Sequence, residues 1–125
     1  MSNSTALRTA AFLGFLAVAL GAFGTHGLKD LLNQNGTAAI WEKAVFYHFI
    51  HTVMLFILAQ QHPIRTGPWV SFLAGIVLFS GSLYLLSVTN IKVLGAITPF
   101  GGISFIIGWL CLVIAPSPKG QTPSP

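Results

Sequence analysis

The chain has 125 residues, enough for one domain and too few for two ordinary ones. Apolar residues make up 54% of it and charged residues only 6%, whereas a soluble domain carries roughly a quarter of charged residues. This composition excludes a soluble enzyme, and the single cysteine, Cys111, excludes a disulfide scaffold. The net charge of +4 comes from basic residues that are scattered singly, so no nucleic-acid surface is expected. The sequence therefore indicates a small integral membrane protein whose partner is the lipid bilayer.

Four charge-poor segments are long enough to cross a membrane. A helix needs about 20 apolar residues to cross a hydrocarbon core about 30 Å thick, and we expect such helices at 7–28, 40–60, 69–88 and 93–115. Lipid cannot satisfy backbone N–H and C=O groups, and the segments do not alternate as barrel strands do, so each is predicted to be helical. The predicted fold is an all-α membrane protein with four transmembrane helices in an up-down bundle. It forms one domain, residues 1–115, followed by a flexible Pro- and Ser-rich tail at 116–125.

Short connections order these helices. Turn residues at 33–36 separate the first two spans, and the first helix is predicted to continue past Lys29 along the membrane surface before that turn. The connection at 89–90 is so short that the last two helices must be antiparallel neighbours. The tryptophans lie near the ends of spans, as in an aromatic belt at the membrane surface: Trp41, Trp69 and Trp109.

The even number of spans places both termini on one side of the membrane. Three basic residues fall on each side, so the positive-inside rule does not choose between the two orientations; we expect both termini in the cytoplasm. The Ala-Val-Ala sequence at 17–19 leaves open a cleaved signal peptide. The apolar run continues to Gly27, however, which is longer than a signal peptide and favours a retained span.

Small residues on the spans predict close packing of helices. In a bilayer, helices associate through small residues and hydrogen bonds, because lipid is as apolar as the helices themselves. The residues assigned to helix packing are Gly14, Gly21, Gly24, Ser80, Gly81, Ser82, Pro99, Gly101, Gly102 and Gly108. They outnumber the contacts that one small bundle needs, so we expect a homo-oligomer.

Pro99 lies inside the fourth span. It has no N–H for the carbonyl of Gly95, and its ring crowds that turn, so the fourth helix is predicted to be kinked or broken there. A packing kink is the simpler interpretation. The alternative is a broken helix that lines a small polar site, as in many transporters, to which Thr98 and Tyr84 of the third span could contribute.

The histidines in the spans are candidate site residues. His26 closes the first span, and His48 and His51 lie three residues apart on the second; ionisable residues at membrane depth are costly and often functional. With Tyr84 and Thr98 they make up the candidate ligand site. Counted from the first turn at 1.5 Å per residue, His26 and His51 differ by about 10 Å in depth. A metal ion shared by His26 and His51 would need an offset turn or a second protomer, so hydrogen-bonded structural histidines are the favoured interpretation. No cofactor is predicted, although a metal or haem site is not excluded by the sequence.

No catalytic motif is present. No Asp or Glu lies within a span, and there is no phosphate loop, dinucleotide fingerprint or serine elbow. The leading hypothesis is a non-enzymatic helix bundle that self-associates. The alternative is a binding or conduction site for a small ligand, metal or ion, formed by His26, His51 and the helix break at Thr98 and Pro99. An enzyme acting on a lipid or quinone through the same histidines ranks last.

Several short segments together resemble a known family. Residues 21–28 read GAFGTHGL, 79–86 read FSGSLYLL, and 94–102 read LGAITPFGG with Gly-Trp following at 108–109. They resemble the GAFGAHGL, FSGSLYLL and LGxITPxGG…GW motifs of the YgdD-like family, also described as domain of unknown function 423. His26 and His51 fall on motif positions of that family and His48 does not. The resemblance implies four helices in a bacterial cytoplasmic (inner) membrane, a small eukaryotic transmembrane relative, and no assigned activity.

Overall fold

A computed structural model of the protein describes residues 1–115, so the predicted tail at 116–125 lies outside the described residues. The described part is helical and contains no β-strand. Its α-helices are α1 (Asn3–Thr25), α2 (Lys29–Asn35), α3 (Ala38–Ala59), α4 (Thr66–Gly75), α5 (Gly81–Thr89) and α6 (Thr98–Ile114). A π-helix, η1 (Ile76–Ser80), joins α4 to α5, and a 3-10 helix, η2 (Lys92–Ala96), precedes α6.

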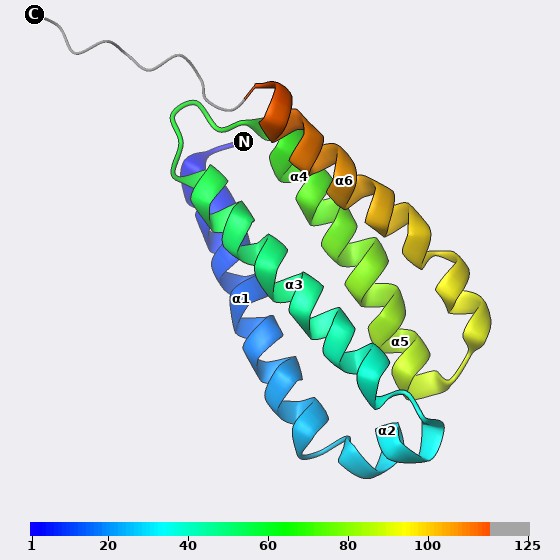
Figure 1. The fold of residues 1–125 in the computed structure, drawn as a ribbon. Helices are drawn as coiled ribbons and strands as arrows, with labels where there is room; N and C mark the ends of the chain where they lie inside the picture. Colours follow the sequence, from blue (N-terminus) through cyan, green and yellow to red (C-terminus); the bar gives the residue numbers. More distant parts are fainter. Residues whose placement is uncertain (116–125) are drawn as a thin grey trace, which may run out of the picture.

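Four helical segments are long and apolar enough to cross a membrane: Asn3–Thr25, Ala38–Ala59, Thr66–Thr89 and Lys92–Ile114. They run alternately up and down, with the N-terminus and the end of α6 at the same end of the bundle (Figure 1). The predicted all-α fold with four spans is therefore confirmed. The first span begins four residues earlier than expected because Ser2 caps it, accepting a hydrogen bond from the Thr5 N–H.

The first turn differs from the prediction. α1 ends at Thr25, so the first helix does not continue past Lys29. A separate short helix, α2, crosses the end of the bundle instead (Figure 1), and Gly36, with a φ of +67°, ends it. The side chains of Asn35 and Thr37 then reach across to α5, where both donate hydrogen bonds to the Ser87 carbonyl, at 3.1 and 2.7 Å. This closes the bundle at that end.

The kink expected at Pro99 is not confirmed. The fourth span consists of η2 followed by α6, and Pro99 lies in the first turn of α6. A proline is well tolerated there because the first N–H groups of a helix have no partner within the helix. The helix type changes before Pro99, and the proline then starts a regular helix.

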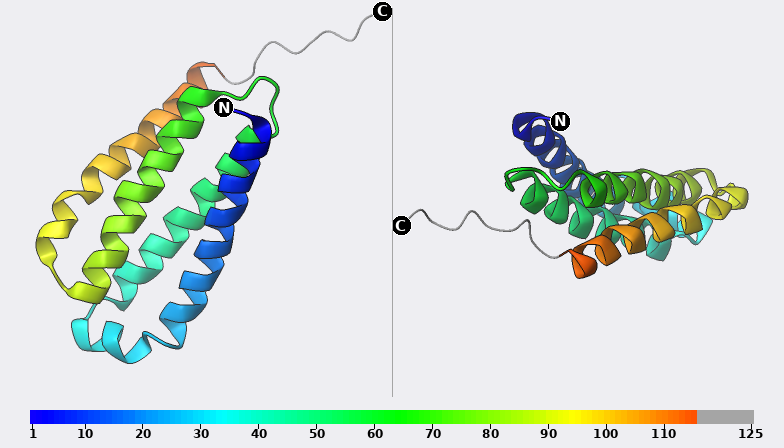
Figure 2. Two further views of the ribbon diagram at one scale, coloured as in Figure 1. Left: turned by 180° about the vertical axis from the view of Figure 1, so that it is seen from behind. Right: turned by 90° about the horizontal axis from the view of Figure 1, so that it is seen from above.

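The helices form an uneven bundle with α3 at its centre. α3 contacts α1 on one side and α4, η1 and α5 on another, whereas α6 packs on α4 and η1. α1 and α6 therefore lie at opposite edges of the molecule, as the views from behind and from above show (Figure 2). Every span exposes apolar side chains, but these two outer helices bury the smallest share of their length.

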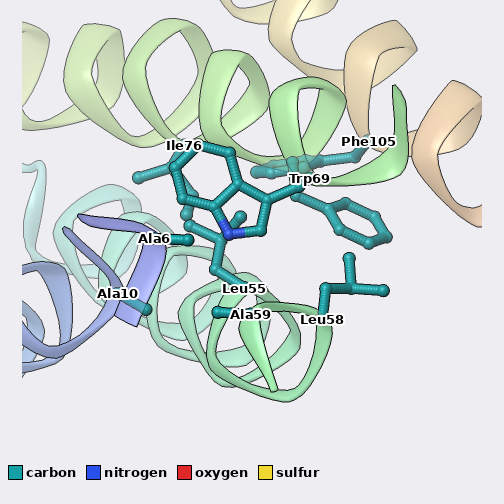
Figure 3. Packing of buried hydrophobic residues seen from close by; sticks show 9 residues of the cluster. Ala6, Ala10, Leu55, Leu58, Ala59, Trp69, Ile76 and Phe105 are labelled. Carbon is teal, nitrogen blue, oxygen red and sulfur yellow. The ribbon is translucent and has the colours of Figure 1, made fainter. Parts of the chain in front are cut away.

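A cluster of buried apolar side chains joins all four spans (Figure 3). Its members are Ala6, Ala10, Leu55, Leu58, Ala59, Trp69, Ile76 and Phe105, together with Phe72. Trp69 is 3% exposed and Trp41 is 5% exposed. The prediction that these two indoles belong to an aromatic belt facing the membrane surface is therefore wrong. Both fill space between helices, and the Trp41 indole N–H donates to the Leu20 carbonyl of α1 at 3.0 Å.

Candidate functional site

His51 is held between three helices. Its Nδ1 lies 2.7 Å from the Tyr47 carbonyl, which can only accept, so Nδ1 carries the proton. Its Nε2 therefore accepts the indole N–H of Trp109 on α6, at 3.0 Å. The imidazole also stacks on Phe105, with 3.6 Å between ring centroids and 13° between planes. Both ring nitrogens are thus engaged, which fixes one neutral tautomer and leaves neither free for a ligand.

His48 lies one turn before His51 on α3 and is 3% exposed. Its Nδ1 is 2.8 Å from the hydroxyl of Tyr84 on α5, and the Tyr84 ring packs on Trp41 at 4.7 Å. Nε2 makes no hydrogen bond, and the backbone of Leu13 in α1 lies close to this side chain. This histidine thus joins α3 to α5 and faces α1.

The third and fourth spans meet through their polar and small residues. The Ser82 hydroxyl donates its proton in a hydrogen bond to the Phe79 carbonyl at 3.0 Å. Thr98 Oγ1 lies 2.6 Å from Ser82 Oγ, and because the Ser82 proton is already used, the Thr98 hydroxyl is the donor of this second bond. One turn further, Gly101 of α6 packs directly on the Phe79 backbone, and a Cβ there would overlap it. Thr98 is thereby a bridge between helices, and the two segments that resemble the family most closely form one interface.

Other residues assigned to helix packing fall into two groups. A Cβ at Gly24 or Gly108 would overlap the ring of Trp41 or Phe72, and the Ser80 hydroxyl donates to the Ala44 carbonyl of α3 at 2.8 Å. The other assigned positions are less tightly packed. A Cβ added to Gly14, Gly21 or Gly102 would make ordinary contacts, at 3.6 Å from Thr52, 3.4 Å from Val45 and 3.9 Å from Phe79, respectively. A Cβ on Gly81 would meet nothing within 4 Å, and Pro99 is exposed.

The histidines do not converge on one site. His26 is exposed at the C-terminal cap of α1, whereas His51 is buried among residues of α3, α4 and α6. Within residues 1–115, no group of three or more His, Cys, Asp or Glu side chains could hold a metal ion. The geometry does not bring together the site expected from His26, His51 and Thr98.

A groove between α1, α2 and α3 has a volume of about 640 Å³. We call it the α1/α3 groove. Its polar end is formed by Thr25, Lys29, Asn33 and Glu42, and its apolar part includes Gly21, Trp41, Val45, Phe46, Phe49 and Ile50. Lys29 and Glu42 are exposed, so their charges are accessible at the end of the groove.

Two of these features are not evident from the sequence. Trp109 was expected at the membrane surface, yet its indole N–H bonds to His51; only the relative rotation of α3 and α6 determines this contact. Glu42 was not assigned to a site, although it is one of only two acidic residues in the chain. That rarity beside an apolar span was a usable signal.

The fold defines a small four-span helical membrane protein, with spans tied together by hydrogen bonds between buried side chains and backbone. The family of uncharacterised proteins described as "Protein of unknown function (DUF423)" matches residues 20–102. The chain belongs to this family, which confirms the resemblance to domain of unknown function 423.

Similar proteins are bacterial membrane proteins without a stated activity. The chain is 49% identical over 107 residues to the UPF0382 membrane protein YwdK of Bacillus subtilis, covering 80% of this chain and 85% of that protein. It is 48% identical over 105 residues to a UPF0382 membrane protein of Staphylococcus epidermidis, covering 80% and 84%. No solved structure matches the chain.

Proposed function

We propose that this protein is a non-enzymatic membrane protein that functions as a self-associating helix bundle. The state of the polar side chains within the spans supports the non-enzymatic part. His51 uses both ring nitrogens, His48 bonds Tyr84, and the Ser80 hydroxyl bonds the Ala44 carbonyl of the neighbouring helix. A general acid or base must reach a substrate within hydrogen-bond distance, and these groups are instead used to join helices.

The position of α1 is the observation that carries the self-association. α1 packs chiefly on α3 at one edge of the bundle, and its outward face exposes Phe15 and Val18, at 66% and 64%. Exposed alanines at positions 11, 19 and 22 lie between the large side chains of this face, which permits close approach of a second helix. The exposed face of α6 is built from bulky side chains that suit lipid, mostly Ile, Leu and Val together with Phe100 and Trp109.

This α1 face replaces the glycines as the expected contact between protomers. Gly24, Gly101 and Gly108 are filled by neighbours within one chain, so they are not free to pack against a second copy. The proposal therefore depends on exposed residues of α1 alone.

The mass of the protein in mild detergent and in lipid nanodiscs tests the proposal. We expect the wild type to form one defined oligomer and the Phe15→Ala, Val18→Ala variant to shift to the mass of a single chain. The matched control changes two exposed residues of α6, Ile106→Ala and Val113→Ala, whose exposed fractions are 58% and 75%, and should keep the wild-type mass. A single-chain wild type in both media, or equal dissociation of the two variants, would overturn self-association through α1.

We also propose that the protein resides in the cytoplasmic membrane with both termini in the cytoplasm. The bacterial membrane relatives and the shared side of the N-terminus and the end of α6 support this topology. Reporter fusions test it: a fluorescent reporter at either terminus should be bright and a periplasmic phosphatase reporter inactive. The reverse pattern would contradict this orientation.

A further inference from the structure

The α1/α3 groove has the shape and polarity of a site for an amphipathic molecule. Its volume of about 640 Å³ falls within the range of roughly 300–1,000 Å³ that is typical of small-molecule sites. Lys29 lies at the start of α2 and Glu42 near the start of α3, so the polar end is at the end of the spans, at the membrane surface. The apolar part extends along the spans toward Ile50.

The depth of the groove sets the length of the apolar group. Glu42 and Ile50 are eight residues apart on α3, which at 1.5 Å per residue corresponds to about 12 Å along the helix. Over this distance the wall is apolar, and Gly21 of α1 has only the Val45 side chain opposite its missing Cβ, at 3.4 Å. A ligand that fits would carry a compact polar head and an alkyl chain that enters between α1 and α3.

The charges at the polar end determine the head. Lys29 supplies a cation that can bind a phosphate, and Glu42 supplies a carboxylate that can accept N–H hydrogen bonds from an ammonium group. A purely anionic head would satisfy Lys29 but meet repulsion from Glu42. A quaternary ammonium would neutralise Glu42 without donating a hydrogen bond.

We propose that the α1/α3 groove binds one phospholipid with a primary ammonium head group, with its phosphate at Lys29, its ammonium at Glu42 and an acyl chain passing Gly21. The site is on the α1, α2 and α3 side of the molecule and does not depend on self-association. It distinguishes this lipid from the surrounding bilayer by the paired opposite charges.

Native mass spectrometry of the purified full chain tests the proposal directly. The protein is titrated separately with phosphatidylethanolamine, phosphatidylcholine and phosphatidylglycerol of identical acyl chains. We expect a single retained phosphatidylethanolamine, bound about tenfold more tightly than either other lipid, which is the effect of one charge-assisted hydrogen bond.

Variants separate the head group from the chain. Glu42→Gln should remove the preference for phosphatidylethanolamine. Lys29→Gln should weaken binding of all three lipids, because each carries a phosphate. Gly21→Leu should abolish retention by filling the groove. The matched controls are Lys43→Gln, a neighbouring charge that does not line the groove, and Gly81→Leu, where a Cβ meets nothing within 4 Å. Both controls should bind as the wild type does.

Three results would overturn the proposal. They are equal retention of the three lipids by the wild type, a preference for phosphatidylglycerol or phosphatidylcholine, and unchanged phosphatidylethanolamine binding by Gly21→Leu with its fold intact. Circular dichroism and thermal unfolding establish the fold of each variant. If Gly21→Leu fails to fold, Glu42→Gln decides the question, because Glu42 is exposed and its substitution leaves the packing of the helices unchanged.

Discussion

Gly101→Ala is expected to weaken the contact between the third and fourth spans. A Cβ on Gly101 would lie 2.7 Å from the Phe79 Cα, whereas ordinary contacts of this kind begin at 3.4 Å, and the backbone of Phe79 cannot rotate away as a side chain could. α6 must therefore retreat by roughly 0.7 Å or more, at an overpacking cost of about 1–3 kcal/mol. The higher helix propensity of alanine offsets about 1 kcal/mol of this cost.

Gly102→Ala provides the matched control, because its Cβ would lie 3.9 Å from the Phe79 ring, in ordinary contact. It gains the same helix propensity without the overlap, so the difference between the two variants isolates the packing cost. We expect Gly101→Ala to unfold with about 1–3 kcal/mol less free energy than Gly102→Ala. The measurement is a titration from mild detergent into sodium dodecyl sulfate, followed by tryptophan fluorescence. Free energies of unfolding within about 0.5 kcal/mol of each other would refute the close approach of the two helices.

Three further measurements test the polar contacts. Trp109→Phe removes the donor to His51, and we expect it to lower the free energy of unfolding by about 0.6–1.7 kcal/mol. When Trp109→Phe is introduced into the His51→Phe variant, the loss of unfolding free energy should be smaller. An equal loss in the two backgrounds would contradict the hydrogen bond between Trp109 and His51. Thr98→Val and Ser82→Ala should each destabilise the bundle, and the double variant should cost less than the sum of the two, whereas strict additivity would show that the hydroxyls are not coupled. Added Zn²⁺ should leave the melting temperature unchanged because both nitrogens of His51 are already bonded; an increase in melting temperature that His51→Phe abolishes would argue for a metal site.

The spans could be predicted from the sequence because composition and length alone determine them. A charge-free run of about 20 residues has few alternatives to a membrane helix. Helix ends were less predictable, since α1 starts at a serine cap and ends at Thr25 before a separate helix. The effect of Pro99 was not predictable either, because it depends on whether the proline falls within a helix or at its first turn.

The candidate site was harder to predict because it depends on how the helices are rotated against one another. The sequence indicates that His51 and Tyr84 are polar groups at membrane depth. It does not show that Trp109 donates a hydrogen bond to His51, or that His48 pairs with the Tyr84 hydroxyl. His48 and His51 are hydrogen-bonded within the bundle, whereas His26 is exposed at the end of α1. The groove, in contrast, combines residues of three helices and becomes visible only in the fold.

The π-helix at Ile76–Ser80 has a consequence for how the third span is shared. A π turn holds about one residue more than an α turn, and each residue of an α-helix advances the side chains by about 100°. The strip that carries Phe72 faces α6 before the wide turn, whereas the strip that carries Tyr84 faces α3 after it. One continuous helical span thus shifts its side-chain register midway: α4 packs on both α6 and α3, whereas α5 packs on α3 and η2. The length of that turn therefore contributes to how the third span is shared between its neighbours.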